Sequence, residues 1–132
     1  MSERTLLIRS DLDIVSARVE GRDLAKALGF GTIDQARIAT AISELTRNIV
    51  LYAGEGTVTL RAIERGNKRG IEVVCEDHGP GIEDVDLVMR DGYSTSRGLG
   101  MGLPGAKRLM DEFEIQSQVG KGTRVTARKW LR

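Results

Sequence analysis

Hydrophobic residues recur along the chain at two spacings, one typical of strands and the other typical of helices. The first apolar run spans residues 5–10, TLLIRS, and predicts a strand. Ser10 or Asp11 can then cap a helix that ends at Gly29 and carries the apolar residues Ile14, Val15, Ala17, Leu24 and Leu28. The N-terminal part of the chain is therefore predicted to be a strand followed by a helix.

A second helix, with clearer sequence signals, is predicted to follow. Thr32 and Gln35 have the spacing of a capping box, in which two side chains satisfy free backbone N–H groups at the start of a helix. Apolar residues then recur at helical spacing, at Ile38, Ile42, Leu45 and Ile49. This stripe predicts the helix face that packs on the core.

The middle of the chain is predicted to form a hairpin. Residues 56–64 and 70–77 are rich in residues that favour strands, and they flank residues 65–70, RGNKRG, which have the composition of a turn. We expect the two strands to pair in an antiparallel manner.

The C-terminal part is predicted to contain both helices and strands. A short helical segment is expected at residues 84–90 and a helix at 104–112, and the strands 113–119 and 123–130 flank the turn GKG. No linker, repeat or low-complexity tract interrupts the pattern, so residues 1–132 are predicted to form a single domain. The fold class is α/β (α+β), a two-layer sandwich with helices on one face of a mixed β-sheet.

Composition argues against several classes of partner and binding site. Lys and Arg total 20 against 19 Asp and Glu, and aromatic residues make up 4% of the chain, which argues against a nucleic-acid partner or an acidic membrane surface. The single Cys75 excludes an internal disulfide, and one histidine leaves no plausible zinc cluster. No segment has the length or apolarity of a signal peptide or a membrane span. We expect a soluble protein of the cytoplasm.

Two glycine-rich stretches require an explanation, because glycine is costly to order. They are EDHGPGI at residues 76–82 and GLGMGLPG at residues 98–105. Each alone could be a turn. The second stretch, however, leads into the predicted helix at Pro104, where free backbone N–H groups and the helix dipole would bind an anion such as phosphate. Gly100, Gly102 and Gly105 satisfy G-x-G-x-x-G, but no strand precedes them as a dinucleotide site requires.

The second predicted helix adds polar groups to this picture. Glu44 and Asn48 are spaced i, i+4, so their side chains project from the same side of the helix. An isolated pair of this kind is usually structural. Here it occurs together with the two glycine-rich stretches and with GKGT at residues 120–123.

These four segments resemble, in order and spacing, the N, G1, G2 and G3 boxes of the GHKL ATPase superfamily. Nearly the whole chain, from DIVSARVEGRDLAKALGF to the final KW, resembles the RsbT-type switch kinases of bacterial stressosomes. The resemblance implies a Bergerat-type ATP-binding fold that uses ATP and Mg²⁺. It also implies a serine/threonine kinase that phosphorylates STAS-domain proteins and, once released, activates a PP2C-type phosphatase.

The resemblance also implies roles for individual residues. Asp77 matches the G1 aspartate that accepts a hydrogen bond from the adenine amino group, Gly79 and Gly81 let the backbone lie against the base, and Thr123 matches the G3 threonine. Asn48 matches the magnesium ligand, and Glu44 is placed to orient or deprotonate the attacking hydroxyl. The phosphate-facing hinge of the lid corresponds to Gly98, Leu99, Gly100, Met101, Gly102 and Leu103.

Several alternatives stay open. Arg97, in the lid segment DGYSTSR, could stabilise the transferred phosphoryl group or be solvated. His78 is expected to be a surface turn residue, Cys75 a small core residue, and Leu109 and Met110 packing residues. The chain could instead be an anti-sigma-factor kinase, or a nucleotide-gated binding module that transfers no phosphate.

Overall fold

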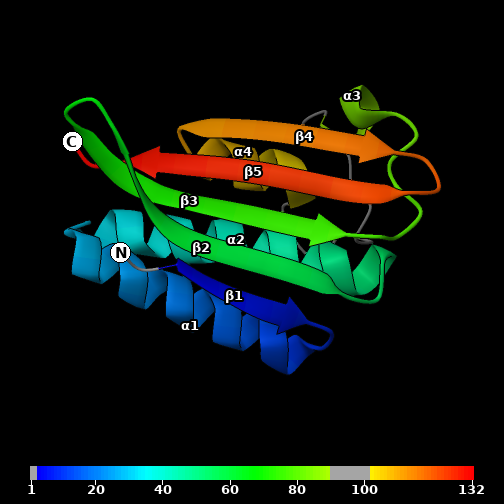
Figure 1. The fold of residues 1–132 in the computed structure, drawn as a ribbon, viewed down its shortest axis with the longest axis horizontal. Coiled ribbons are helices and arrows are strands. Elements are labelled where there is room, and N and C mark those ends of the chain that lie inside the picture. Colours follow the sequence, from blue (N-terminus) through cyan, green and yellow to red (C-terminus); the bar gives the residue numbers. More distant parts are fainter. Residues whose placement is uncertain (1–2, 90–101) are drawn as a thin grey trace.

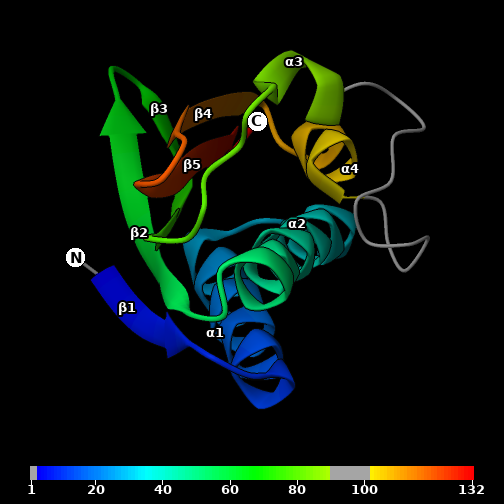
Figure 2. The same cartoon turned by 90° about the vertical axis from the view of Figure 1, so that its right-hand side faces the viewer.

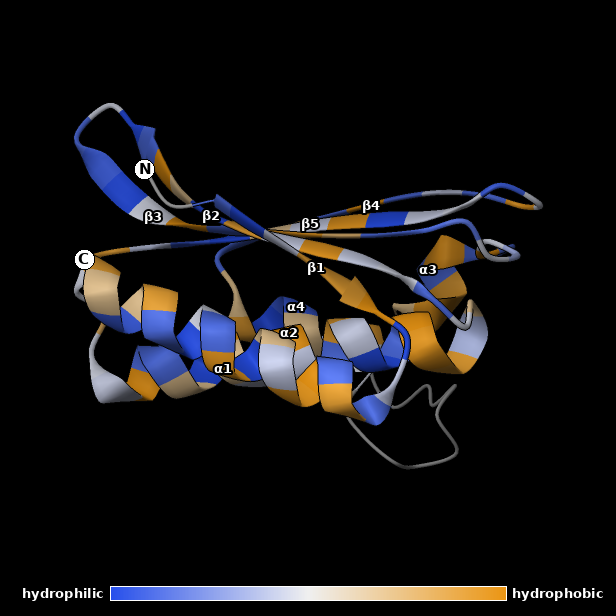
Figure 3. Ribbon diagram, turned by 60° about the horizontal axis from the view of Figure 1, so that its bottom comes forward, coloured by the Kyte–Doolittle hydropathy of each residue, from blue (hydrophilic) through white to orange (hydrophobic). Residues whose placement is uncertain are grey.

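The computed structural model describes residues 3–89 and 102–132. In these residues five strands form one sheet, and the longer helices cover one of its faces (Figures 1 and 3). The elements follow the order β1 (Glu3–Ile8), α1 (Asp11–Leu28), α2 (Thr32–Tyr52), β2 (Gly56–Arg65), β3 (Lys68–Asp77), α3 (Val85–Val88), α4 (Gly102–Leu109), β4 (Glu112–Gln118) and β5 (Gly122–Trp130). The predicted two-layer α+β architecture is confirmed. None of the helices in this described part is long and apolar enough to cross a membrane.

The sheet is antiparallel throughout, which corrects the expectation of a mixed sheet. Its strand order is β1-β2-β3-β5-β4, and each neighbouring pair is antiparallel. Two helices in succession, α1 and α2, connect β1 to β2 and return the chain to the same end of the sheet, so that β2 runs opposite to β1. The strands β3 and β4, linked through α4, do share a direction, but β5 lies between them.

The first helix follows its sequence signals. Ser10 is the N-cap and its Oγ accepts a hydrogen bond from the backbone N–H of Asp13, while Gly29 caps the other end. Asp13 in turn accepts a hydrogen bond from the N–H of Arg9. The predicted strand at residues 5–10 ends earlier than expected, at Ile8, because Arg9 and Ser10 serve this cap.

The start of α2 differs from the predicted capping box. Thr32 is already helical, the N-cap is Gly31, and the cap has no side-chain hydrogen bond. Gln35 is buried and its Nε2 donates to the carbonyl oxygen of Phe30 at 2.8 Å. A buried carbonyl such as that of Phe30 needs a hydrogen-bond donor, so the Gln35 side chain bonds to it and does not cap the start of α2.

The apolar stripe of α2 packs as predicted. Its residues Ile38, Ile42, Leu45 and Ile49 are buried in the core. They belong to the same core cluster as the inward-facing residues of the central strands, Val58, Leu60, Ile71 and Val73. Cys75 and Met110 are also buried there, as expected for packing residues. The helix α2 lies between α1 and α4 (Figure 2).

The C-terminal elements are shifted slightly from their predicted limits. The short helix α3 begins after Asp84, whose side chain accepts from the N–H of Leu87, so Asp84 is a cap. The helix α4 starts at Gly102 and ends at Leu109, since β4 begins at Glu112.

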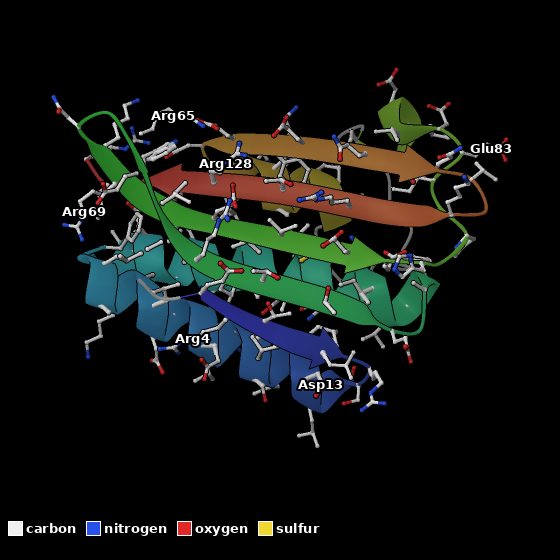
Figure 4. All side chains as sticks on the ribbon, in the orientation of Figure 1. Arg4, Asp13, Arg65, Arg69, Glu83 and Arg128 are labelled. Atoms are coloured by element: carbon white, nitrogen blue, oxygen red, sulfur yellow. The ribbon has the colours of Figure 1, made fainter. Side chains whose placement is uncertain are left out.

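The other face of the sheet carries charged side chains (Figure 4). Arg61 and Arg128 both pair with the buried Glu72, at 2.6 and 2.7 Å. Arg65 and Arg128 pair with Glu112, at 2.7 and 3.1 Å. This alternation of apolar and charged positions is typical of an antiparallel sheet with one face in water.

Candidate functional site

The end of β3, the start of β5 and the C-terminus of α2 lie at one end of the molecule (Figure 1). Residues from these segments line a cavity of about 440 Å³. Residues 80–88 and the first turn of α4 complete its wall. Six residues predicted from the sequence line it: Asn48, Asp77, Gly81, Gly102, Leu103 and Thr123. Segments that are far apart in the sequence therefore meet at one cavity.

Two predicted residues that the structure describes do not line the cavity. Glu44 and Gly79 are not among the residues that line the cavity, although both make hydrogen bonds to residues that do. The predicted residues Arg97, Gly98, Leu99, Gly100 and Met101 lie outside the described residues. His78 is exposed, as expected for a turn residue.

Asp77 is the last residue of β3, and its carboxylate is held in a fixed orientation. Its Oδ1 accepts a hydrogen bond from the backbone N–H of Gly79 at 2.9 Å. No other hydrogen bond to this carboxylate occurs within residues 3–89 and 102–132, so the other oxygen can accept one from a ligand. The side chain is half-buried at the cavity wall. The site therefore offers an oriented hydrogen-bond acceptor at its wall.

Glycines allow the loop after Asp77 to pack against the β4–β5 turn. Gly81 has φ 78°, and a Cβ atom there would lie 2.4 Å from the carbonyl oxygen of Gln118. Gly122 has φ 129°, and a Cβ atom would lie 2.1 Å from the carbonyl oxygen of Asp77. Both contacts are with backbone, so a side chain at either position would push the loop and the strand apart.

Ser117 joins three segments of this wall, and sequence reasoning missed it. Its Oγ accepts from the N–H of Ile82 at 2.7 Å and donates to the carbonyl oxygen of Gly122 at 3.1 Å. It also lies 2.9 Å from Oγ1 of Thr123. Because the serine proton is directed to Gly122, the threonine hydroxyl donates to Ser117, and this fixes Thr123 at the cavity wall. Ser117 lies near the end of the edge strand β4, and a serine at such a position carries no sequence signal for this role.

Glu44 lies beside the cavity and is engaged through both of its oxygens. Oε1 accepts from the backbone N–H of Gly102 at 3.0 Å, and Oε2 pairs with Nη1 of Arg47 at 2.7 Å. Glu44 is thus tied both to its own helix and to the first residue of α4. The sequence indicated the glutamate, but gave no sign of its contact with Gly102.

Cys75 also lines the cavity, but its chemistry is that of a core residue. Burial raises the pKa of its thiol strongly, and the negative charges of Asp77 and Glu76 raise it further. The thiol therefore stays protonated at neutral pH, which makes it a poor nucleophile and a poor metal ligand.

The polar lining fits a cation that arrives together with a ligand. No group of three or more His, Cys, Asp or Glu side chains that could hold a metal occurs within residues 3–89 and 102–132. The amide oxygen of Asn48 can provide one ligand to a hard cation. Mg²⁺ typically retains waters and takes its other ligands from substrate phosphates.

Comparison with a family model and with known proteins shows several similarities. The family described as "Histidine kinase-, DNA gyrase B-, and HSP90-like ATPase" matches residues 33–132. The serine/threonine-protein kinase RsbT of Bacillus subtilis (strain 168) is 58% identical over 125 residues, which cover 95% of this chain and 94% of RsbT. An anti-sigma F factor of Caldanaerobacter subterraneus is 40% identical over 107 residues, 76% of this chain and 73% of that protein.

Solved structures show the same fold. The RsbU and RsbW domains of a Mycobacterium tuberculosis protein superpose with a TM-score of 0.65 at 20% identity, over 100% of this chain and 34% of that one. The mycobacterial sensor histidine kinase MprB gives a TM-score of 0.57 at 15% identity, over 98% of this chain and 97% of that one. The chain belongs to the histidine kinase-, DNA gyrase B- and HSP90-like ATPase family. Within this family it is a serine/threonine kinase of the RsbT type.

Proposed function

We propose that the chain binds ATP with Mg²⁺ and transfers the γ-phosphoryl group to a serine or threonine of a STAS-domain protein in the cytoplasm. The observation that carries this proposal is the single cavity that gathers Asn48, Asp77, Gly102 and Thr123, with Glu44 beside it. These residues belong to four elements, α2, β3, α4 and β5, and only the folded chain brings them to one place.

Asp77 and Thr123 would recognise the base. The free oxygen of Asp77 would accept a hydrogen bond from the adenine amino group, since its other oxygen is occupied by Gly79. Thr123, fixed by Ser117, would reach the adenine from the neighbouring strand. The backbone at Gly79 and Gly81 would lie next to the base.

The phosphate end would be formed by α2 and the start of α4. Asn48 would hold Mg²⁺ together with the phosphates, and Glu44 would act on the attacking hydroxyl. The phosphates would lie against the segment that leads into α4, at Gly98, Leu99, Gly100, Met101, Gly102 and Leu103. When bound, the metal ion would neutralise charge that develops on the phosphates.

Phosphoryl transfer depends mainly on alignment and on stabilisation of charge. In our proposal the acceptor oxygen forms a bond to the γ-phosphorus, the bond from this phosphorus to the β–γ bridging oxygen breaks, and ADP leaves with that electron pair. The proton of the acceptor hydroxyl passes to Glu44. Neither the chain's own histidine nor any other residue of it carries the phosphate.

The relatives favour one partner class over another. RsbT of Bacillus subtilis is 58% identical over 95% of the chain, whereas anti-sigma F factors from several bacteria are 32 to 40% identical over 70 to 76% of it. We therefore propose a STAS-domain acceptor and, after release, activation of a PP2C-type phosphatase, in preference to binding of a sigma factor.

The test is incubation of the chain with Mg-ATP and a purified STAS-domain protein, read by intact mass. One phosphate on the STAS protein, stable in acid and labile in base, and none on the kinase, is expected. Label on His78 would contradict the proposal. A STAS protein that binds but stays unmodified would indicate a nucleotide-gated binding module instead.

A further inference from the structure

The carboxylate of Glu44 is held by two groups from different parts of the chain. Arg47, one turn further along α2, places Nη1 2.7 Å from Oε2. The N–H of Gly102, at the start of α4, lies 3.0 Å from Oε1. The side chain of Glu44 is 10% exposed and that of Arg47 is 33% exposed. Arg47 is therefore a cation in direct contact with a mostly buried carboxylate.

A second ion pair on the same helix shows what is unusual here. Asp34 and Arg37 have the same i, i+3 spacing and a distance of 3.0 Å, but their side chains are 27% and 52% exposed. Exposed pairs at this spacing contribute little, because water screens them and both side chains lose freedom. Burial of Glu44 and its second bond to Gly102 distinguish the Glu44–Arg47 pair from this surface pair.

We propose that Arg47 is a positioning residue for Glu44 in the phosphotransfer reaction, a role that rests on the function proposed above. By holding Oε2, Arg47 would fix the plane of the carboxylate and leave Oε1 as the atom that receives the acceptor's proton. The proton moves from the acceptor hydroxyl to Oε1 while the new O–P bond forms and the bond to the bridging oxygen of ADP breaks. Arg47 itself neither gains nor loses a proton in this step.

The hydrogen bond from Gly102 to Oε1 of Glu44 agrees with these separate roles, in which Oε2 binds Arg47 and Oε1 receives the proton. The Gly102 N–H belongs to the first turn of α4, where a bound phosphate would compete for the same donor. When a phosphate oxygen takes that N–H, Oε1 is released, whereas Oε2 keeps its partner. Arg47 thus retains the orientation of Glu44 at the moment when its other anchor is lost.

The test compares Arg47→Met and Arg47→Lys with the matched control Arg37→Met. Kinetics are measured with Mg-ATP and a STAS-domain protein that the wild-type chain phosphorylates. We expect Arg47→Met to lower kcat roughly 10- to 100-fold, less than the about 100- to 10,000-fold that general-base catalysis typically contributes, because Glu44 itself remains; the KM for ATP should stay within about twofold of the wild type. Arg47→Lys should recover much of the loss, and Arg37→Met should be unaffected.

Two further measurements separate positioning from a structural role. In a Glu44→Gln background, Arg47→Met should cause no additional loss, because its effect acts through Glu44. The amide signal of Gly102 in a nitrogen-15 NMR spectrum of the nucleotide-free chain should shift and exchange faster in Arg47→Met, but not in Arg37→Met. This amide reports the position of Oε1 without any phosphotransfer.

The outcomes are distinct. Wild-type kcat in a folded Arg47→Met variant, an unchanged Gly102 amide, or losses that multiply in the double variant would each overturn the positioning role. Losses that multiply would show that Arg47 acts on the phosphate directly. A wild-type chain that transfers no phosphate would overturn the proposed function itself, and this role with it.

Discussion

Asp77→Asn changes hydrogen bonding at the end of the cavity that we propose binds the base, here called the base end, with almost no change in the size of the side chain. In the structure Oδ1 of Asp77 accepts from the N–H of Gly79 at 2.9 Å. An asparagine can keep this bond only if its carbonyl oxygen faces Gly79, which leaves its NH₂ group where the free carboxylate oxygen was. The adenine amino group is also a donor, so two donors would face each other.

The expected loss can be estimated from this geometry. A hydrogen bond to a charged group contributes about 1.5 to 3 kcal/mol, so ATP should bind roughly 10- to 150-fold more weakly. Rotation of the amide would restore an acceptor for adenine, but it would place the NH₂ group against the N–H of Gly79. Both orientations of the asparagine therefore lose one bond.

Calorimetry with Mg-ATP measures the effect, and thermal unfolding of the nucleotide-free variant checks the fold. Inosine triphosphate is the control ligand, because it carries an oxygen acceptor in place of the amino group. It should bind Asp77→Asn at least as well as it binds the wild type. Wild-type affinity for ATP in a folded variant would refute the role of Asp77.

Four other changes address separate parts of the molecule. Asn48→Ala should fold and lose Mg²⁺-dependent phosphotransfer, and full activity across a Mg²⁺ titration would exclude it as the metal ligand. Glu44→Ala should bind ATP, as calorimetry would show, but lose turnover. Ser117→Ala should lower both the melting temperature and the affinity for ATP, because three segments share its hydroxyl. The hydrogen bonds from Arg65 and Trp130 lower the pKa of Glu112 from 4.5 to about 2. The ionised Glu112 therefore stabilises the fold fully above about pH 4.5, and this stabilisation is lost as the pH falls towards 2. Glu112→Gln should weaken the acid dependence of stability, measured by unfolding followed by tryptophan fluorescence.

Local features of the fold could be predicted from the sequence because their signals lie within a few residues. Ser10 and Gly29 set the ends of α1, and the stripe from Ile38 to Ile49 sets the buried face of α2. The predicted capping box at Thr32 was wrong because the side chain of Gln35 instead donates a hydrogen bond to the buried carbonyl oxygen of Phe30. Propensity near a helix end is a weak constraint when a buried polar group needs a partner.

The direction of the strands could not be read in the same way. We expected a mixed sheet, but the pair α1–α2 acts as one connection that returns the chain to the end of the sheet where β1 finishes, so β2 pairs antiparallel to β1. Similarly, Ser117 reaches Ile82 across 35 residues, and Glu44 reaches Gly102 across 58. These contacts depend on the completed sheet, so no local spacing encodes them.

The two ends of the cavity are built differently, and this difference predicts how substitutions will act. The base end is held by bonds that also hold the sheet and the loop, namely those of Ser117 and the close backbone contact between Gly122 and Asp77. A change there should lower stability and nucleotide affinity together. At the phosphate end, Glu44 is held by one ion pair and one backbone N–H, and neither bond contributes to the sheet. Changes at that end can therefore alter turnover while the fold and the base site remain intact.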